Sequence, residues 1–252
     1  LNFTWWVNRK DPEGRNAFQG GFLGLDNIGV FDRSRPNLPG GKRLEQADGT
    51  AWMGLFCLDM LAIALELTRT RPAYEAIATK FFEHFVSISH AINGICGQIG
   101  MWHEADGFYY DVIREPGGEP EHLRIRSLVG LVPLFAVLTI EPGTLERLPH
   151  FRRRMEWYIK YRPTLTGNLC LITKPGDGGH LMMAVADRAK LERVLPRILD
   201  PEQFLSDYGV RSMSKGLAAE PYHCHGSVVS YEPAESTNPM YGGNSNWRGP
   251  VW

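Results

Sequence analysis

The chain has 252 residues, 43% of them hydrophobic and 11% aromatic, so it can bury a large core and is not a disordered protein. Its formal net charge of -1, from 27 basic and 28 acidic residues, excludes the general basic surface of a protein that binds nucleic acid or an anionic membrane. The four cysteines have neither CxxC nor zinc-site spacing, which favours a reducing, cytoplasmic compartment and predicts no metal and no cofactor. The longest apolar run, residues 127–140, is shorter than the roughly 20 residues of a membrane-spanning helix, so we expect no membrane partner.

The first notable segment, residues 20–33, reads GGFLGLDNIGVFDR. Its glycines would cost conformational entropy in a regular helix or strand. Two aspartates, Asp26 and Asp32, stand among aliphatic and aromatic residues, where an unpaired charge is expensive. An acid in this apolar, glycine-rich segment therefore suggests a functional role.

Four segments have the periodicity of helices. Residues 51–67 are apolar on nearly every side, which predicts an inner helix surrounded by protein. Residues 73–93 carry apolar side chains three or four positions apart, which predicts an outer, amphipathic helix. The alternation repeats with an apolar segment at 123–138 and an amphipathic one at 145–161. These segments predict helical hairpins in two layers.

The predicted helices are separated by some unusually long connections, such as residues 94–121. Loops of this length in a compact domain usually carry function. We therefore predict an all-α fold, a partial (α/α)6 toroid with inner and outer helical rings and long functional loops at one end. The chain starts without a methionine, and we expect residues 1–252 to be an incomplete catalytic barrel domain that continues past Trp252 and follows further chain.

Several of the long loops mix carboxylates with aromatic residues and glycine. They include LEQADGTAW (44–52), MWHEADGFYYD (101–111), YEPAES (231–236) and GGNSNWRGPVW (242–252). Aromatic faces pack on sugar rings while carboxylates and arginines bind hydroxyl groups, so this mixture is typical of a carbohydrate pocket. Any one loop alone is also consistent with a hydrogen-bonded turn around a buried aromatic. The candidate substrate-binding residues are Phe22, Glu45, Gln46, Asp48, Trp102, Asp106, Trp247, Arg248 and Gly249. For Asp48, an N-terminal cap of the helix beginning near Ala51 is the alternative.

The motifs NWRGPVW (246–252), DGTAW (48–52), DGFYYD (106–111) and GFLGLDNIG (21–29) resemble glycoside hydrolase family 63 in its bacterial branch, relatives of processing α-glucosidase and mannosylglycerate hydrolase. The resemblance spans nearly the whole chain. It implies an (α/α)6 barrel that hydrolyses an α-linked glucoside or a similar α-glycoside, in an oligosaccharide or small glycoside, with inversion of configuration. The family's general acid corresponds to Asp26, although Leu25 stands where the family has tryptophan. The family's general base follows the W-R-G-P-x-W segment, so we expect it beyond Trp252, with Glu235 as the internal alternative.

An inverting glycosidase needs one carboxylic acid that is still protonated near neutral pH and a second carboxylate, about 6.5–9.5 Å away, that activates water. Apolar neighbours such as Phe22 and Ile28 would raise the pKa of Asp26 by disfavouring its charged form. Two other classes of function stay open. One is a sugar epimerase or isomerase that would use histidines, of which the segments contain His103 and the pair His223 and His225. The other is a noncatalytic carbohydrate-binding protein. The sequence does not set the linkage, the aglycone or the oligomeric state.

Overall fold

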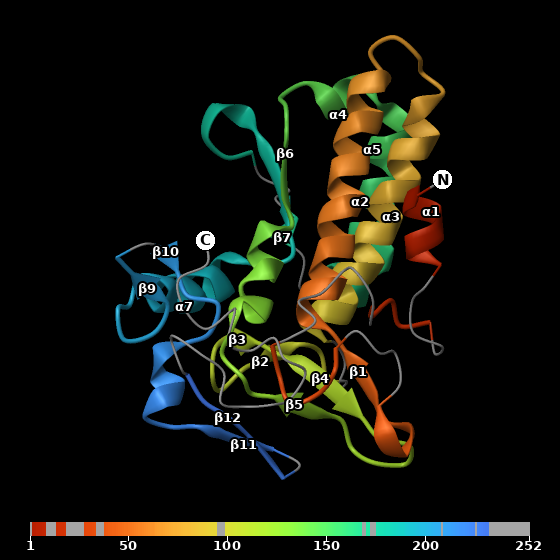
Figure 1. The fold of residues 1–252 in the computed structure, drawn as a ribbon. Coiled ribbons are helices and arrows are strands. Elements are labelled where there is room, and N and C mark those ends of the chain that lie inside the picture. The colour runs from red at the N-terminus through yellow and green to blue at the C-terminus, as the bar shows by residue number, and fades with distance from the viewer. Residues whose placement is uncertain are drawn as a thin grey trace.

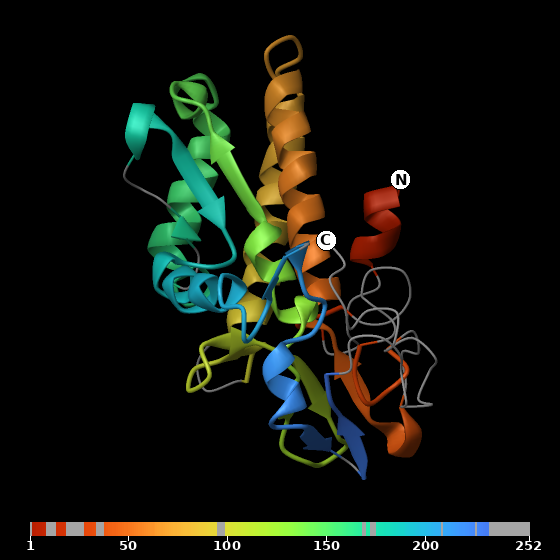
Figure 2. The same ribbon diagram turned by 60° about the vertical axis from the view of Figure 1, so that its left-hand side comes forward.

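The computed structural model describes residues 2–8, 14–18, 28–33, 38–94, 99–167, 170–171, 175–207, 209–224 and 226–231. Helices account for 48% of these residues and strands for 18%, with several small antiparallel sheets (Figure 1). The fold is therefore mixed α and β, and the prediction of an all-α (α/α)6 toroid is wrong. The long helices gather at one end of the molecule with one small sheet beside them, and most of the other strands lie at the opposite end (Figure 2).

The helical part is built around an antiparallel pair, α2 (Ala47–Leu67) and α3 (Tyr74–Asn93). α5 (Pro149–Tyr161) packs on α3, where the ring of Phe82 meets Phe151 and Tyr158 edge to face. α1 (Asn2–Val7) closes the other side, because Phe3 contacts Phe56 of α2 and Phe81 of α3. The helices predicted at 51–67 and 73–93 are thus confirmed. The helix predicted at 145–161 is divided into α4 (Thr144–Arg147) and α5, because Leu148 leaves helical geometry and Pro149 starts the second helix.

By length and composition α2 is the one described helix that could cross a membrane. The helix packs along α3 instead, and its side chains Met53, Cys57 and Leu61 are fully buried inside the protein. Burial on several sides explains the nearly uniform apolar sequence of α2 as well as a lipid environment would. The remaining helices are α6 (Pro163–Thr166) and α7 (Arg188–Ile198), together with the short 3-10 helices η2 (Pro39–Gly41), η3 (Leu128–Gly130), η4 (Val132–Phe135), η5 (Asp177–Gly179) and η6 (Lys215–Ala218).

Three of the strands lie in the connection predicted at residues 94–121. β1 (Arg43–Glu45), β4 (Asp111–Arg114) and β5 (Glu121–Leu123) form an antiparallel sheet in the order β1-β4-β5, with Leu44 opposite Ile113. β2 (Trp102–His103) and β3 (Phe108–Tyr109) form a hairpin beside it. The other pairings are β6 (Val137–Ile140) with β8 (Leu181–Ala184) and β7 (Cys170–Leu171), β9 (Leu205–Ser206) with β10 (Gly209–Val210), and β11 (Tyr222–Cys224) with β12 (Ser227–Val229).

The predicted inner helix at 123–138 is instead the end of β5, two 3-10 helices and the start of β6. Two residues explain the difference. Pro133 has no backbone N–H and disrupts a regular helix. Gly130 packs so closely on the β2-β3 hairpin that an added Cβ would lie 2.2 Å from both Phe108 Cε1 and the backbone oxygen of Tyr109. The apolar composition of 123–138 therefore reflects burial of irregular chain rather than helix.

Candidate functional site

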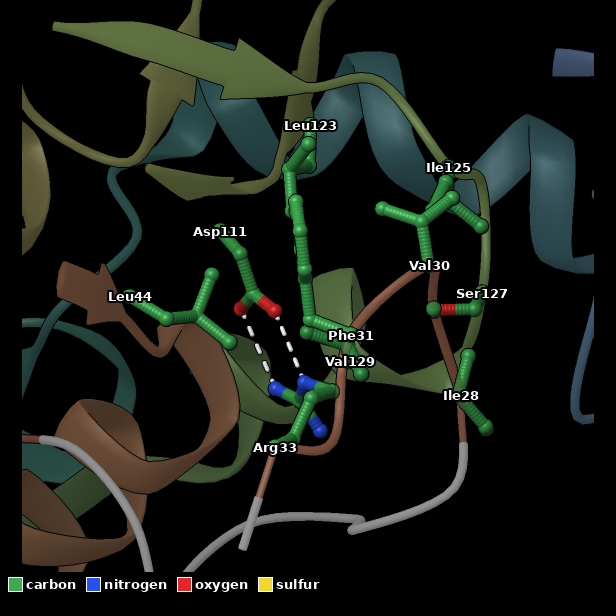
Figure 3. A pocket seen from close by; sticks show the side chains of 11 residues that line it. Ile28, Val30, Phe31, Arg33, Leu44, Asp111, Leu123, Ile125, Ser127 and Val129 are labelled. Carbon is green, nitrogen blue, oxygen red and sulfur yellow. Dashed lines mark hydrogen bonds and ion pairs between the residues drawn. The ribbon is translucent and has the colours of Figure 1, made fainter. Parts of the chain in front are cut away.

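The N-terminal end of α2 holds a buried cluster of one arginine and two carboxylates. Arg33 Nε lies 2.8 Å from Asp111 Oδ2 (Figure 3). Its Nη2 lies 2.6 Å from Asp48 Oδ1. Two longer contacts at 3.1 Å, Nη1 to Asp48 and Nη2 to Asp111, make the guanidinium bidentate toward both acids. Each of the three residues comes from a different part of the chain, so the cluster ties the segment at 28–33 to α2 and to β4.

The two carboxylates also satisfy the first turn of α2. Asp111 Oδ1 accepts the backbone N–H of Ala47 at 2.8 Å, and Asp48 Oδ1 accepts that of Gly49 at 2.7 Å. Both interactions place negative charge at the positive end of the helix dipole. Asp48 thus lies within the first turn, while Gln46 occupies the N-cap position without capping through its side chain.

The charges in this cluster perturb one another. Burial disfavours the charged form of Arg33, but the carboxylates of Asp111 and Asp48 outweigh it and raise the pKa of Arg33, which stays cationic. Burial raises the pKa of Asp111, opposed by the charge of Arg33 and reinforced by the neighbouring Asp48. The buried cluster contains one cation and two acids, so it carries an excess of negative charge. The positive end of the α2 dipole partly offsets this charge.

Glu45 and Gln46 lie next to this cluster. The side chain of Gln46 is fully buried, and its Nε2 donates to the backbone oxygen of Arg33 at 2.6 Å. Glu45 pairs with two arginines, with its Oε1 2.5 Å from Arg15 Nη2 and 2.8 Å from Arg114 Nε. These three charged side chains line a cavity of about 230 Å³ that also contains the ring of His90. Of the predicted binding residues Glu45, Gln46 and Asp48, Glu45 is therefore the one that lines this cavity.

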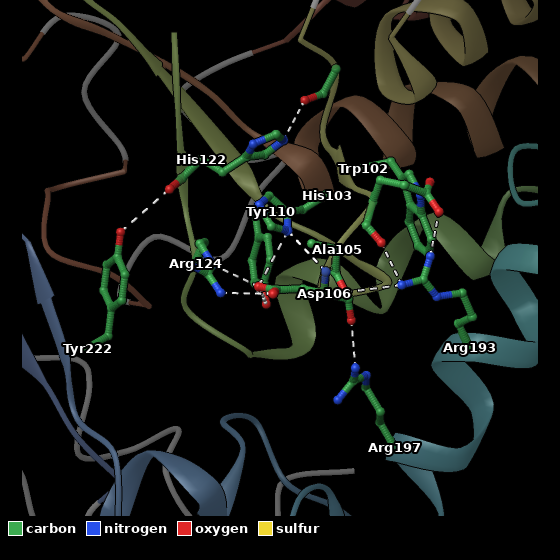
Figure 4. Close-up of polar contacts among 12 residues, drawn as sticks. Trp102, His103, Ala105, Asp106, Tyr110, His122, Arg124, Arg193, Arg197 and Tyr222 are labelled. Atoms are coloured by element: carbon green, nitrogen blue, oxygen red, sulfur yellow. Dashed lines mark hydrogen bonds and ion pairs between the residues drawn. The ribbon is translucent and has the colours of Figure 1, made fainter.

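Trp102 and Asp106 belong to a second cluster, on the β2-β3 hairpin (Figure 4). Trp102 Nε1 donates to Glu104 Oε2 at 2.7 Å, and its ring lies below the cations of Lys190 and Arg193. Asp106 accepts from Arg124 through both oxygens, at 2.8 Å each, and from the Tyr110 hydroxyl at 3.0 Å. Burial would raise the pKa of Asp106, but the hydrogen bonds from Arg124 and Tyr110 and the charges of Arg124 and His103 outweigh it, so the pKa is lowered.

Asp106 also lines a cleft of about 470 Å³, within the size range of small-molecule sites. Its lining comes from the hairpin, from the chain after β5, from η6 and from the start of β11. The polar residues among the lining are Asp106, Tyr110, Arg124, Arg126, Ser214, Glu220 and Tyr222. This mixture of carboxylates, arginines and tyrosines is the type predicted for a carbohydrate pocket.

The predicted site residues therefore fall into two groups. Glu45, Gln46 and Asp48 surround the N-terminus of α2, while Trp102 and Asp106 are part of the hairpin. The consecutive residues Tyr110 and Asp111 connect them, because Tyr110 bonds Asp106 and Asp111 bonds Arg33. The predicted residues Phe22, Asp26, Trp247, Arg248 and Gly249 lie outside the described residues, as does Glu235, so the shared pocket predicted for all of them stays a prediction.

Sequence reasoning missed Arg33, Asp111, Arg124 and Arg126. Arg33 and Asp111 both stand inside motifs that drew attention for other residues, and both follow runs of aromatic and aliphatic residues. A charge in such a run indicates a buried ion pair, although 78 positions separate these partners and no spacing rule pairs them. Within the part of the chain that the structure describes, no group of three or more His, Cys, Asp and Glu side chains could hold a metal ion.

Comparison with known proteins gives one informative similarity. No family model matches the chain. The chain is similar to the uncharacterized protein YMR196W of Saccharomyces cerevisiae, with 48% identity over 269 aligned positions that include the whole of this chain. The aligned region is 24% of the yeast protein, so the chain spans about a quarter of the length of the relative it matches.

Proposed function

We propose that this chain is part of an inverting glycoside hydrolase acting on α-linked glucosides or related α-glycosides, with Asp26 as the general acid. The observation that carries the proposal is the anchoring of the segment after Asp26. Arg33 fixes that segment to Asp48 and Asp111 at the N-terminus of α2. The resemblance of the GFLGLDNIG and DGTAW motifs to family 63 concerns these same two segments.

A general acid acts only when it lies within hydrogen-bond reach of the leaving oxygen, and this requires a rigid support. Ile28 and Val30 are buried against Leu123, Ile125 and Val129, which together line a small cavity beside the ion cluster (Figure 3). Asp26 stands two residues before Ile28, and two residues of extended chain span about 7 Å at most. The anchored segment therefore limits the region in which the Asp26 carboxyl can act.

The charged residues around α2 support Asp26 over the described acids. Asp48 and Asp111 are both committed to Arg33, and Glu45 is bound by Arg15 and Arg114. The oxygens of a carboxylate paired with arginine are occupied by its guanidinium, which suits positioning of neighbouring groups better than donation of a proton to a leaving oxygen. The general base that activates water is proposed to follow the W-R-G-P-x-W segment in the longer protein, with Glu235 as the alternative.

The isomerase alternative finds less support in the arrangement of His103. Its Nδ1 accepts the backbone N–H of Asp106 at 3.1 Å, which holds the ring inside the hairpin turn. The described residues that line the 470 Å³ cleft include no histidine. An acid–base pair of histidines acting on a sugar therefore has no candidate among these lining residues.

The proposal is tested with the full-length protein and α-linked glucose disaccharides. Proton NMR of the first product should show β-glucose before mutarotation, because an inverting enzyme places water on the opposite face of the ring. Initial release of α-glucose would contradict inversion. Binding without release of free sugar would indicate a carbohydrate-binding protein, and deuterium incorporation from solvent into unchanged sugar would indicate an isomerase.

A further inference from the structure

Of the two arginines that line the cleft beside Asp106, Arg124 is paired with Asp106, whereas Arg126 forms no ion pair with a described residue. Asp106 is the buried acid of the cleft, and Arg124 with Tyr110 already occupies its oxygens. Glu220 also lines the cleft but is exposed to solvent. Lys215 of η6 is paired with Glu202 at 2.9 Å and adds no free charge.

Two arginines near Asp106, of which Arg126 lines the cleft and Arg197 does not, form no ion pair with a carboxylate among the described residues. Arg126 lines the cleft and interacts with the hydroxyl of Tyr110. Nη2 of Arg197 on α7 donates to the backbone oxygen of Asp106 at 2.6 Å (Figure 4). Its Nη1 donates to Gln203 Oε1 at 3.3 Å. Its Nε is buried without a hydrogen-bond partner in the described part of the chain. Neutral acceptors alone therefore bind both guanidinium groups.

Arg126 and Arg197 are also close enough to affect each other. Burial lowers the pKa of Arg197 and the positive charge of Arg126 lowers it further, while Tyr110 and the carboxylate of Asp106 partly oppose this shift. Like charges in a partly buried site destabilise the fold unless an anion lies between or beside them. Arginine forks match the oxygens of phosphate and carboxylate groups in particular.

From these contacts we infer that the cleft is an anion-binding site, in which Arg126 binds the phosphate or carboxylate group of a small ligand. Tyr222 lines the same cleft, is half-buried, and offers an apolar face for the uncharged part of that ligand. The arrangement has the size and the polar lining of a small-molecule site, and the ligand supplies the missing negative charge. This inference is independent of the proposed hydrolysis, since Asp26 takes no part in it.

The test uses inorganic phosphate and the full-length protein at low salt, with binding measured by calorimetry. Arg126→Gln should weaken phosphate binding at least about tenfold, the loss expected for a charge-assisted hydrogen bond. The matched control is Arg153→Gln on α5, an exposed arginine that also lacks a carboxylate partner among the described residues and should bind as the parent does. Equal binding by the parent and Arg126→Gln would overturn the inference.

Further ligands and a stability measurement distinguish the alternatives. Glucose 6-phosphate should bind more tightly than glucose, while acetate tests whether a carboxylate suffices. Preference for glucose with no binding of phosphate would make the cleft a neutral sugar site. Without phosphate, Arg126→Gln should melt no lower than the parent, because it removes repulsion with Arg197. If Arg126→Gln lowered the melting temperature equally with and without phosphate, Arg126 would be a structural support of Tyr110 and not a ligand-binding residue.

Discussion

Arg33 and Asp111 are 78 positions apart in the sequence, and the Nε of the first lies 2.8 Å from Oδ2 of the second in a site closed to solvent. The same Asp111 carboxylate caps the first turn of α2 through Ala47. One pair of residues therefore connects the segment after Asp26, the central helix and the β1-β4-β5 sheet.

Arg33→Met should destabilise the protein by about 3–5 kcal/mol, because it leaves two buried carboxylates without a cation. Urea denaturation of the full-length protein measures the change. The exposed Arg188, which pairs with Glu192 on α7, provides the control, and Arg188→Gln should change the free energy of unfolding by less than about 0.5 kcal/mol. If the two variants were equally stable, the ion cluster would not hold the segment.

Two glycine substitutions should have opposite effects. Gly130→Ala should destabilise by at least about 2 kcal/mol, since its Cβ would overlap the backbone oxygen of Tyr109. Gly54→Ala should stabilise by about 0.5–1 kcal/mol, because Gly54 is in α2 and a Cβ there would make ordinary contacts with Ile88, Ala136 and Val185. Thermal melting of both variants checks the pair. A neutral or stabilising Gly130→Ala would contradict the close packing of η3 on the hairpin.

The sequence predicts the long helices of this fold but not its sheets. The 3.6-residue period gives α3 and α5 because each buries a defined face, and α2 follows from its long, almost uniformly apolar sequence. The sheets are missed because their strands have two to four residues, too few for alternation to be recognised. The segment at 123–138 is misread because the apolar residues of buried irregular chain imitate those of a helix.

The candidate site, like the fold, is only partly predictable from the sequence. Asp48, Asp106 and Glu45 are identifiable as polar residues in aromatic, glycine-containing segments. Their partners Arg33, Arg124 and Arg114 are set by tertiary packing between distant segments, which no local pattern encodes. Composition of a loop thus indicates that an acid has a role, but only the fold shows whether that acid meets solvent or an arginine.

The stability contributed by Asp106 should depend on pH. Its pKa is lowered in the folded protein, so its stabilising effect is present above the unfolded value near 3.8 and is lost as pH falls through the lower folded value. The difference in melting temperature between the parent and Asp106→Asn should be largest near neutral pH and shrink below about pH 4. Melting curves from pH 7 to pH 2.5 measure it, and Arg124→Gln should abolish most of the same dependence. A difference independent of pH would contradict the ionised Asp106–Arg124 pair.

The isolated 252-residue polypeptide should self-associate. Large apolar side chains are exposed on several elements, with Ile63 of α2 at 53%, Phe135 of η4 at 50% and Leu199 after α7 at 65% exposure. Exposed apolar surface of this kind promotes association. Light scattering on a sizing column should show oligomers, and Ile63→Ser combined with Phe135→Ser should reduce them, whereas Lys80→Ser on α3 should not. A polypeptide that is monomeric at high concentration would contradict this expectation.

The role of Asp26 is tested most directly by the leaving-group dependence of Asp26→Asn in the full-length protein. If Asp26 protonates the leaving oxygen, kcat on a natural α-glucoside should fall by about 10²-fold or more, the usual contribution of a general acid. Substrates with fluoride or activated aryl leaving groups need little protonation, so on them the variant should recover much of its rate. An equal loss of rate on natural and activated substrates, or hardly any loss on either, would contradict the assignment of Asp26 and with it the proposed hydrolytic mechanism.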